Sequence, residues 1–197
     1  MSSIRSIIAV ALTAFAFSGV SAQSFQVDAS HSSVGFKIKH LGIATVAGTF
    51  KEFDAKFGFD EKTNSLSIVD ATIKTKSIHT NEEKRDSHLK GGDFFDVDKF
   101  PVITFKASKP VAVKKGAVVK VPGELTIKGV TKPVVLNVKY AGIAKDPWGN
   151  TKLGFEADTK IKRADFGLTW NKTLETGGLL VGEDVDIKIE GEAAPAQ

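Results

Sequence analysis

Apolar and polar side chains alternate along most of the chain, and the alternation is clearest over residues 33–40. One face of an extended chain would carry Val34, Phe36, Ile38 and His40. The opposite face carries two lysines, as expected for a strand with one side buried and one side in water. The same period of two, with turn residues between the runs, predicts strands at residues 25–28, 33–40, 46–59, 65–78, 102–113, 117–127, 134–143, 152–162 and 184–190.

One segment departs from this pattern and predicts a short helix. Thr80, followed three residues later by Glu83, fits a capping box in which the threonine caps the helix. The polar run that follows is compatible with a helix as far as Lys90. Gly91 and Gly92 would then end it.

The number and length of the strands limit the architecture. Antiparallel strands must hide their edges, either in two stacked sheets or in a closed barrel. The predicted strands often reach ten residues, which favours a barrel. An eight-stranded barrel can be filled by its own side chains or can hold one elongated ligand, and the pattern does not choose between these.

The two ends of the chain do not fit the strand pattern. Residues 1–22 have a single charge at Arg5, an apolar stretch and a small-residue cleavage motif ending at Ala22, which predicts a cleaved export signal. We therefore expect residues 23–191 to form one exported domain in a bacterial periplasm. Residues 192–197 are rich in alanine, and we expect them to form a flexible tail.

The composition excludes several kinds of site. The chain has no cysteine, so disulfides, thiolate metal sites and cysteine nucleophiles are ruled out. No nucleophile elbow, phosphate loop or dinucleotide motif is present, and the histidines lack metal-ligand spacing, so we predict neither a catalytic residue nor a metal site. The net charge of +4 is spread along outward strand positions, which indicates a solvated face. Transient contact with a membrane surface is the alternative, whereas nucleic-acid binding is not expected.

Large apolar side chains on inward faces are the strongest candidates for function. Fourteen phenylalanines are present, and twelve of them follow the predicted signal. Each could be part of a filled core or part of the wall of a lumen that holds an apolar chain. The predicted lumen residues are Phe36, Ile38, His40, Phe53, Phe57, Ile73, Phe105, Leu136, Val138, Phe155, Phe166, Leu168 and Trp170.

Several polar and aromatic residues near the predicted strand ends allow a structural or a functional interpretation. His40 could be held by a backbone carbonyl, or it could contact the head group of a ligand. Arg163 and Asp165 are predicted to pair at a strand end. The loop containing Phe94, Phe95 and Phe100 is predicted to form an aromatic plug between loop and barrel.

Taken in order, several motifs resemble those of the YceI-like family, also called the polyisoprenoid-binding or lipid-binding barrel family. They extend over nearly all of the chain after the predicted signal, at residues 28–36 with His40, 48–50, 93–97, 100–105, 123–131 with Pro133, 163–167 and 181–185. The resemblance implies an all-β fold, an extended eight-stranded antiparallel lipocalin-like barrel with one short inserted helix. It also implies a hydrophobic lumen for an isoprenoid, quinone or fatty amide, a periplasmic location and, in many members, a homodimer.

Three functions follow from these observations. The first is a non-enzymatic carrier that holds a long-chain amphiphile and needs no cofactor. The second is an enzyme that modifies or hydrolyses such a molecule, and it would require a polar cluster deep in the lumen beside His40. The third is a structural stress-response barrel whose lumen is occluded.

Overall fold

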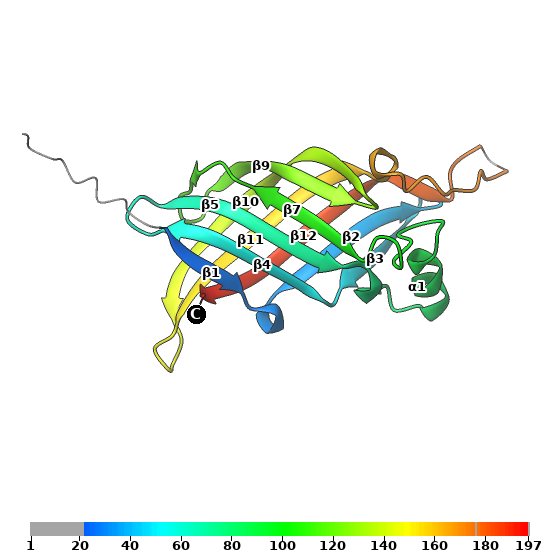
Figure 1. The fold of residues 1–197 in the computed structure, drawn as a ribbon. Helices are drawn as coiled ribbons and strands as arrows, with labels where there is room; N and C mark the ends of the chain where they lie inside the picture. The colour runs from blue at the N-terminus through cyan, green and yellow to red at the C-terminus, as the bar shows by residue number, and fades with distance from the viewer. Residues whose placement is uncertain (1–21, 176, 197) are drawn as a thin grey trace, which may run out of the picture.

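The computed structural model describes residues 22–175 and 177–196. The export signal predicted for residues 1–22 lies outside the described residues, apart from Ala22. Figure 1 shows a long barrel with the helix α1 (Glu83–Lys90) at one end and the C-terminus at the other.

Eight antiparallel strands close the barrel, as predicted. The closed path runs β1-β4-β5-β7-β9-β10-β11-β12, and pairing of β12 with β1 completes it. These strands are β1 (Gln23–Val27), β4 (Phe53–Asp60), β5 (Ser65–Lys74), β7 (Val102–Ala107), β9 (Val118–Ile127), β10 (Val130–Lys145), β11 (Thr151–Lys162) and β12 (Val181–Pro195). Because each of the eight strands pairs with a neighbour on both sides, none of them is left as a free sheet edge along its whole length.

Further strands lengthen the barrel at the helical end. They are β2 (Ser33–His40), β3 (Ala44–Phe50) and β6 (Ile78–His79), while β8 (Val111–Ala112) pairs with β5. Three short 3₁₀ segments interrupt the chain: η1 (Ala29–His31), η2 (Thr75–Ser77) and η3 (Arg163–Phe166). The predicted limits of β2 agree with the structure.

Two predicted long strands are each divided in two, and backbone hydrogen bonds join the two chain segments at the break. The prediction of one strand over residues 46–59 is wrong, since β3 and β4 are separated at Lys51 and Glu52. The amide of Lys51 donates to the carbonyl of Ser77, and the carbonyl of Glu52 accepts from Lys74. The predicted strand over residues 65–78 is broken at η2 by the same pair of contacts.

The helix α1 (Glu83–Lys90) ends at Gly91 as predicted, but Thr80 does not cap it. Glu82 is the N-cap, and its carboxylate accepts from the backbone amides of Lys84 and Arg85. The hydroxyl and the amide of Thr80 donate to the buried carboxylate of Asp86. A glutamate outside the helix therefore satisfies its first free amides, while the threonine fastens the helix to the segment before it.

The prediction of a flexible tail at residues 192–197 is wrong for the residues that the structure describes. Strand β12 continues to Pro195, and Ala193 is fully buried between Val27 of β1 and Leu153 of β11. The barrel needs this strand for closure, and an alanine leaves room for the large side chains packed around it. Within residues 22–175 and 177–196, no helix has the length and apolar character required to cross a bilayer.

Candidate functional site: an apolar cavity in the barrel

The barrel encloses an elongated cavity of about 550 Å³. Its wall is built from side chains at alternate strand positions, since every second residue of a barrel strand points inward. Twelve of the thirteen predicted lumen residues lie on this wall: Phe36, Ile38, His40, Phe53, Phe57, Ile73, Phe105, Leu136, Val138, Phe155, Leu168 and Trp170. The structure therefore favours a hollow barrel over a filled one.

Phe166 is the predicted lumen residue that does not reach the cavity. It lies in η3 rather than in a strand, and it is buried among core side chains. Its prediction rests on the alternation of Phe166, Leu168 and Trp170 along an extended chain. The 3₁₀ turn breaks that period, so Phe166 points into the packed core while Leu168 points into the cavity.

Sequence reasoning also missed part of the wall. Strands β9 and β12 were predicted, but no inward face was assigned to either of them. Their alternate apolar positions line the cavity at Val121, Leu125, Ile127, Val185, Ile187 and Ile189. The period of two was the signal that could have found them.

One end of the cavity is closed by packed aromatic rings. The rings of Phe25 and Phe57 stack with centroids 5.8 Å apart, and Phe59 lies 5.0 Å from Tyr140. Tyr140 and Phe155 line the cavity at this end, and burial is the main factor that raises the pKa of the Tyr140 phenol. The cluster is built from residues of β1, β4, β11 and β12, and Figure 1 shows β1 and the end of β12 away from α1. The packed rings therefore close the cavity on that side.

The other end reaches the protein surface near α1. The exposed side chains of Lys39, Lys84 and His88 all border the cavity, so the cavity opens to solvent there. We call this end the mouth.

Asp54 of β4 is the one carboxylate among the described residues that border the cavity, and Gln26 donates a hydrogen bond to it.

An aromatic cluster partly covers the mouth, in agreement with the predicted plug. The ring of His88 lies 4.8 Å from Trp170 and 5.0 Å from Phe94, measured between centroids. Phe94 and Phe95 border the cavity, whereas Phe100 packs against Gly129 outside it. The Nε2 atom of His88 lies 2.8 Å from the carboxylate of Asp93, which orients the ring.

A buried arginine holds the backbone of the mouth. The guanidinium of Arg163 donates to the carbonyls of Gly182 (2.8 Å), Leu168 and Trp170 (2.9 Å). The predicted pair with Asp165 is wrong, because these carbonyls take the guanidinium donors and Asp165 is exposed. Burial lowers the pKa of Arg163, while the charge of Glu183 opposes this.

Comparison with known proteins agrees with this architecture. The family model of the YceI-like domain matches residues 25–193 of this chain. The chain belongs to the YceI family. Among curated relatives, the Protein YceI of Salmonella arizonae and that of Salmonella paratyphi B are each 45% identical over 150 residues, covering 75% of this chain and 78% of theirs.

Solved structures support the same YceI barrel. The YceI protein of Campylobacter jejuni is 38% identical, with a TM-score of 0.69, over 82% of this chain and 91% of that one. BcnA of Burkholderia cenocepacia is 27% identical, with a TM-score of 0.70, over 85% and 99%. A polyisoprenoid binding domain from Saccharophagus degradans is 16% identical, with a TM-score of 0.64, over 88% and 99%, and shows likeness of fold.

His40 lies at the mouth of this YceI barrel. It is the last residue of β2, half-buried, and pairs with Val181 and Ala44. Among the described residues, no hydrogen bond to the His40 ring is present, so the interpretation that a backbone carbonyl holds it is not supported. Its ring borders the cavity and is free to meet a ligand.

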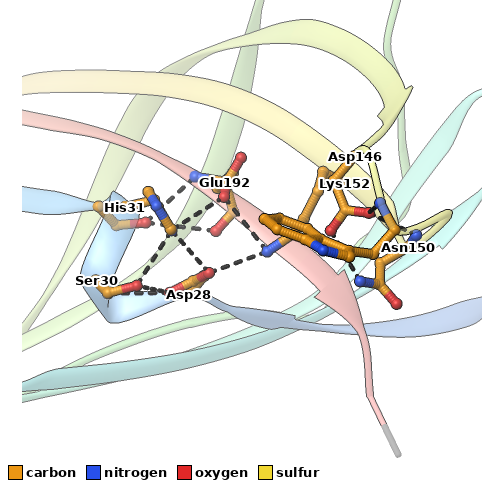
Figure 2. A network of polar contacts seen from close by, with 9 residues as sticks. Asp28, Ser30, His31, Asp146, Asn150, Lys152 and Glu192 are labelled. Carbon is orange, nitrogen blue, oxygen red and sulfur yellow. Dashed lines mark hydrogen bonds and ion pairs between the residues drawn. The ribbon is translucent and has the colours of Figure 1, made fainter.

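A polar network on the barrel wall was not predicted, although it includes the first residues of the YceI motif (Figure 2). Asp28 accepts from the hydroxyl of Ser30, lies 3.0 Å from Nδ1 of His31 and accepts from Nζ of Lys152 at 3.0 Å. Glu192 lies within 3.4 Å of the same ammonium. The hydrogen bond from Ser30, followed by those from His31 and Lys152, holds the pKa of Asp28 well below its usual range.

This network has the donor types of a metal site but also contains its own cation. Ligand atoms of Asp28, His31 and Glu192 lie within 4.8 Å of one another. The ammonium of Lys152 contacts both carboxylates and offsets one of their two negative charges. We assign the network a structural role, because it ties the break between β1 and β2 to β11 and β12, where the barrel closes.

Proposed function

We propose that the protein is a non-enzymatic carrier for a long-chain apolar amphiphile, with an isoprenoid, quinone or fatty amide as the ligand class. The observation that carries the proposal is the cavity of about 550 Å³, walled by aromatic and aliphatic side chains and closed at one end. A cavity of this size lies within the range of small-molecule sites. Its lining extends from His88 in α1 to Tyr140 in the aromatic cluster at the closed end, which suits a chain better than a compact ligand.

The energetics of such binding follow from the wall. Burial of apolar surface gains about 25 cal/mol per Å², so a chain can bind tightly with few polar contacts. The free energy of apolar burial does not depend on the direction of contacts. The wall therefore specifies the identity of the chain only weakly. In our proposal, His40 and the cationic side chains at the mouth contact the polar head group.

Two further observations support a carrier. Members of the chain's family share this barrel, and the Saccharophagus neighbour, whose likeness to this chain carries the fold alone, is described as a polyisoprenoid binding domain. Within the described lining, the sole carboxylate is Asp54, and no lining hydroxyl is hydrogen-bonded to His40 or His88. The polar cluster that an enzyme would require beside His40 is thus not found among these residues.

We also propose export to a bacterial periplasm, on the basis of the apolar stretch and cleavage motif at the start of the sequence. Terminal sequencing of protein from a periplasmic extract tests this, and the expected first residue is Gln23. A homodimer is implied by the family resemblance. Analytical ultracentrifugation of the mature chain tests that part of the proposal.

The carrier function is tested by native mass spectrometry of protein purified without detergent, followed by organic extraction. The expected result is an added mass that extraction removes and that is recovered as a lipid. A variant with Ala55→Trp, which places a large ring on the cavity wall, should carry much less of it. Absence of any bound lipid, together with failure to bind a lipophilic dye, would contradict the proposal.

A further inference from the structure

Two loops beside the mouth present aliphatic side chains to solvent. Ile43, in the turn between β2 and β3, is 85% exposed, and Leu41 in the same turn is 39% exposed. Leu179, just before β12, is 42% exposed. We call these three residues the mouth patch. Large aliphatic side chains grouped around a cavity opening mark an interaction site more often than single exposed ones do.

The mouth patch is continuous with the cavity wall. The amide of Leu41 donates to the carbonyl of Leu180 at 2.9 Å, and the amide of Ile43 donates to the carbonyl of His40 at 3.2 Å. Both acceptor residues, Leu180 and His40, border the cavity. Figure 1 shows both loops at the end of the barrel that carries α1. The mouth patch therefore lies directly beside the cavity wall.

The charges around the mouth patch are mixed. Lys39 and Lys172 are exposed there, and so are Glu175 and Glu183. Attraction to an anionic surface is consequently weak, and burial of the aliphatic side chains is the main driving force available. A lipid bilayer interface offers such burial without requiring a complementary charge pattern.

We propose that the mouth patch inserts shallowly into a lipid bilayer, so that the ligand passes between membrane and lumen without entering water. The proposal rests on the carrier function proposed above, because it explains how a molecule that water does not dissolve reaches the cavity. A second copy of the chain is a poorer occupant. It would cover the mouth, and three side chains fall well below the roughly 800 Å² per partner of a stable interface.

Docking is tested first on the ligand-free protein with neutral phosphatidylcholine vesicles, by flotation. The wild type is expected to float with the vesicles with little dependence on salt. Ile43→Ser should reduce the vesicle partition coefficient by about tenfold or more, since one buried isoleucine side chain is removed. The matched control is Ile68→Ser, because Ile68 is 66% exposed on β5 and follows Ser67, which pairs with Gly58 between two phenylalanines of the aromatic cluster at the closed end.

Ligand transfer is tested next, with a fluorescent lipophile moving from vesicles to the protein. Transfer to the wild type and to Ile68→Ser should accelerate as vesicle concentration rises, as expected for a collisional step. Ile43→Ser should transfer several-fold more slowly yet retain equilibrium binding of the lipophile, since Ile43 does not border the cavity. Failure of the wild type to bind the lipophile at equilibrium would instead count against the carrier function.

Three results would overturn the bilayer proposal. One is a wild type that does not float with neutral vesicles. Another is an Ile43→Ser variant that floats and transfers like the wild type. The third is a stable wild-type dimer that Ile43→Ser dissociates, which would assign the mouth patch to a second copy.

Discussion

Lengthening the alkyl chain of a bound amphiphile should increase affinity only up to the capacity of the cavity. At roughly 30 Å³ per heavy atom, the cavity of about 550 Å³ holds about 18 heavy atoms. Each added methylene should gain about 0.8 kcal/mol until that length, which is about a fourfold decrease in Kd per carbon. Longer chains should gain little, because their ends remain at the mouth.

The assay is displacement of a fluorescent lipophile by a series of straight-chain alcohols that spans this length. The structure also provides a variant that moves the limit. Ala55 borders the cavity from β4, and Ala55→Leu adds three carbons, or about 90 Å³ at the same density. The plateau should then begin about three carbons earlier. Ala112→Leu, at an exposed position on β8, is the control and should leave it unchanged.

Two outcomes would refute this reasoning. Affinity that rises steadily well past the predicted limit would mean that the aromatic cluster does not close the cavity. Affinity that does not depend on chain length would mean that the lumen is not where the chain binds. A plateau that moves equally in both variants would point to a general loss of stability, which urea denaturation of each variant would detect.

Three other predictions concern stability and can be measured by urea denaturation. Arg163→Ala should lower the free energy of unfolding by about 3 kcal/mol, because buried carbonyls at the mouth lose a charged donor; an unchanged midpoint would contradict this. Asp28 has a depressed pKa in the folded state, so its stabilising contribution is present above the unfolded pKa near 3.9 and is lost as pH falls. Asp28→Asn should therefore be less stable at neutral pH and show less acid sensitivity, whereas an unchanged pH dependence would assign the stabilisation to other groups. Ala193→Asp should destabilise the barrel by several kcal/mol, since it buries a charge where β12 meets β1; a mild effect would mean that the C-terminal strand is dispensable.

The sequence predicted local periodicity well, and this accounts for most of the fold. The limits of β2, the end of α1 at Gly91 and the inward faces of β4 and β10 all follow from alternation or from glycine near a helix end. Alternation also placed twelve side chains on the cavity wall. These features depend on residues near one another in the chain, which is the range over which pattern reasoning applies.

The wrong predictions concern long-range contacts that no local pattern records. The break between β3 and β4 depends on bonds to residues of the 74–77 segment, more than twenty positions away. Arg163 was assigned a carboxylate partner, but its donors are taken by carbonyls, whose positions a sequence does not reveal. Ala193 was assigned to a flexible tail because small residues carry little pattern, although small size is what its fully buried position requires.

The two ends of the barrel differ in a way that suits a carrier. At the closed end, aromatic rings pack together, and the nearby network around Asp28 and Lys152 fixes the seam of the barrel. At the mouth, the structure is held instead by the hydrogen bonds of Arg163 to loop carbonyls and by contacts among aromatic rings. Ring contacts can separate without leaving polar groups unpaired, whereas breaking the Asp28 network would leave charges without partners. The mouth can therefore open at its ring contacts while the Arg163 hydrogen bonds stay in place, and His40 lies beside the path that a ligand would take.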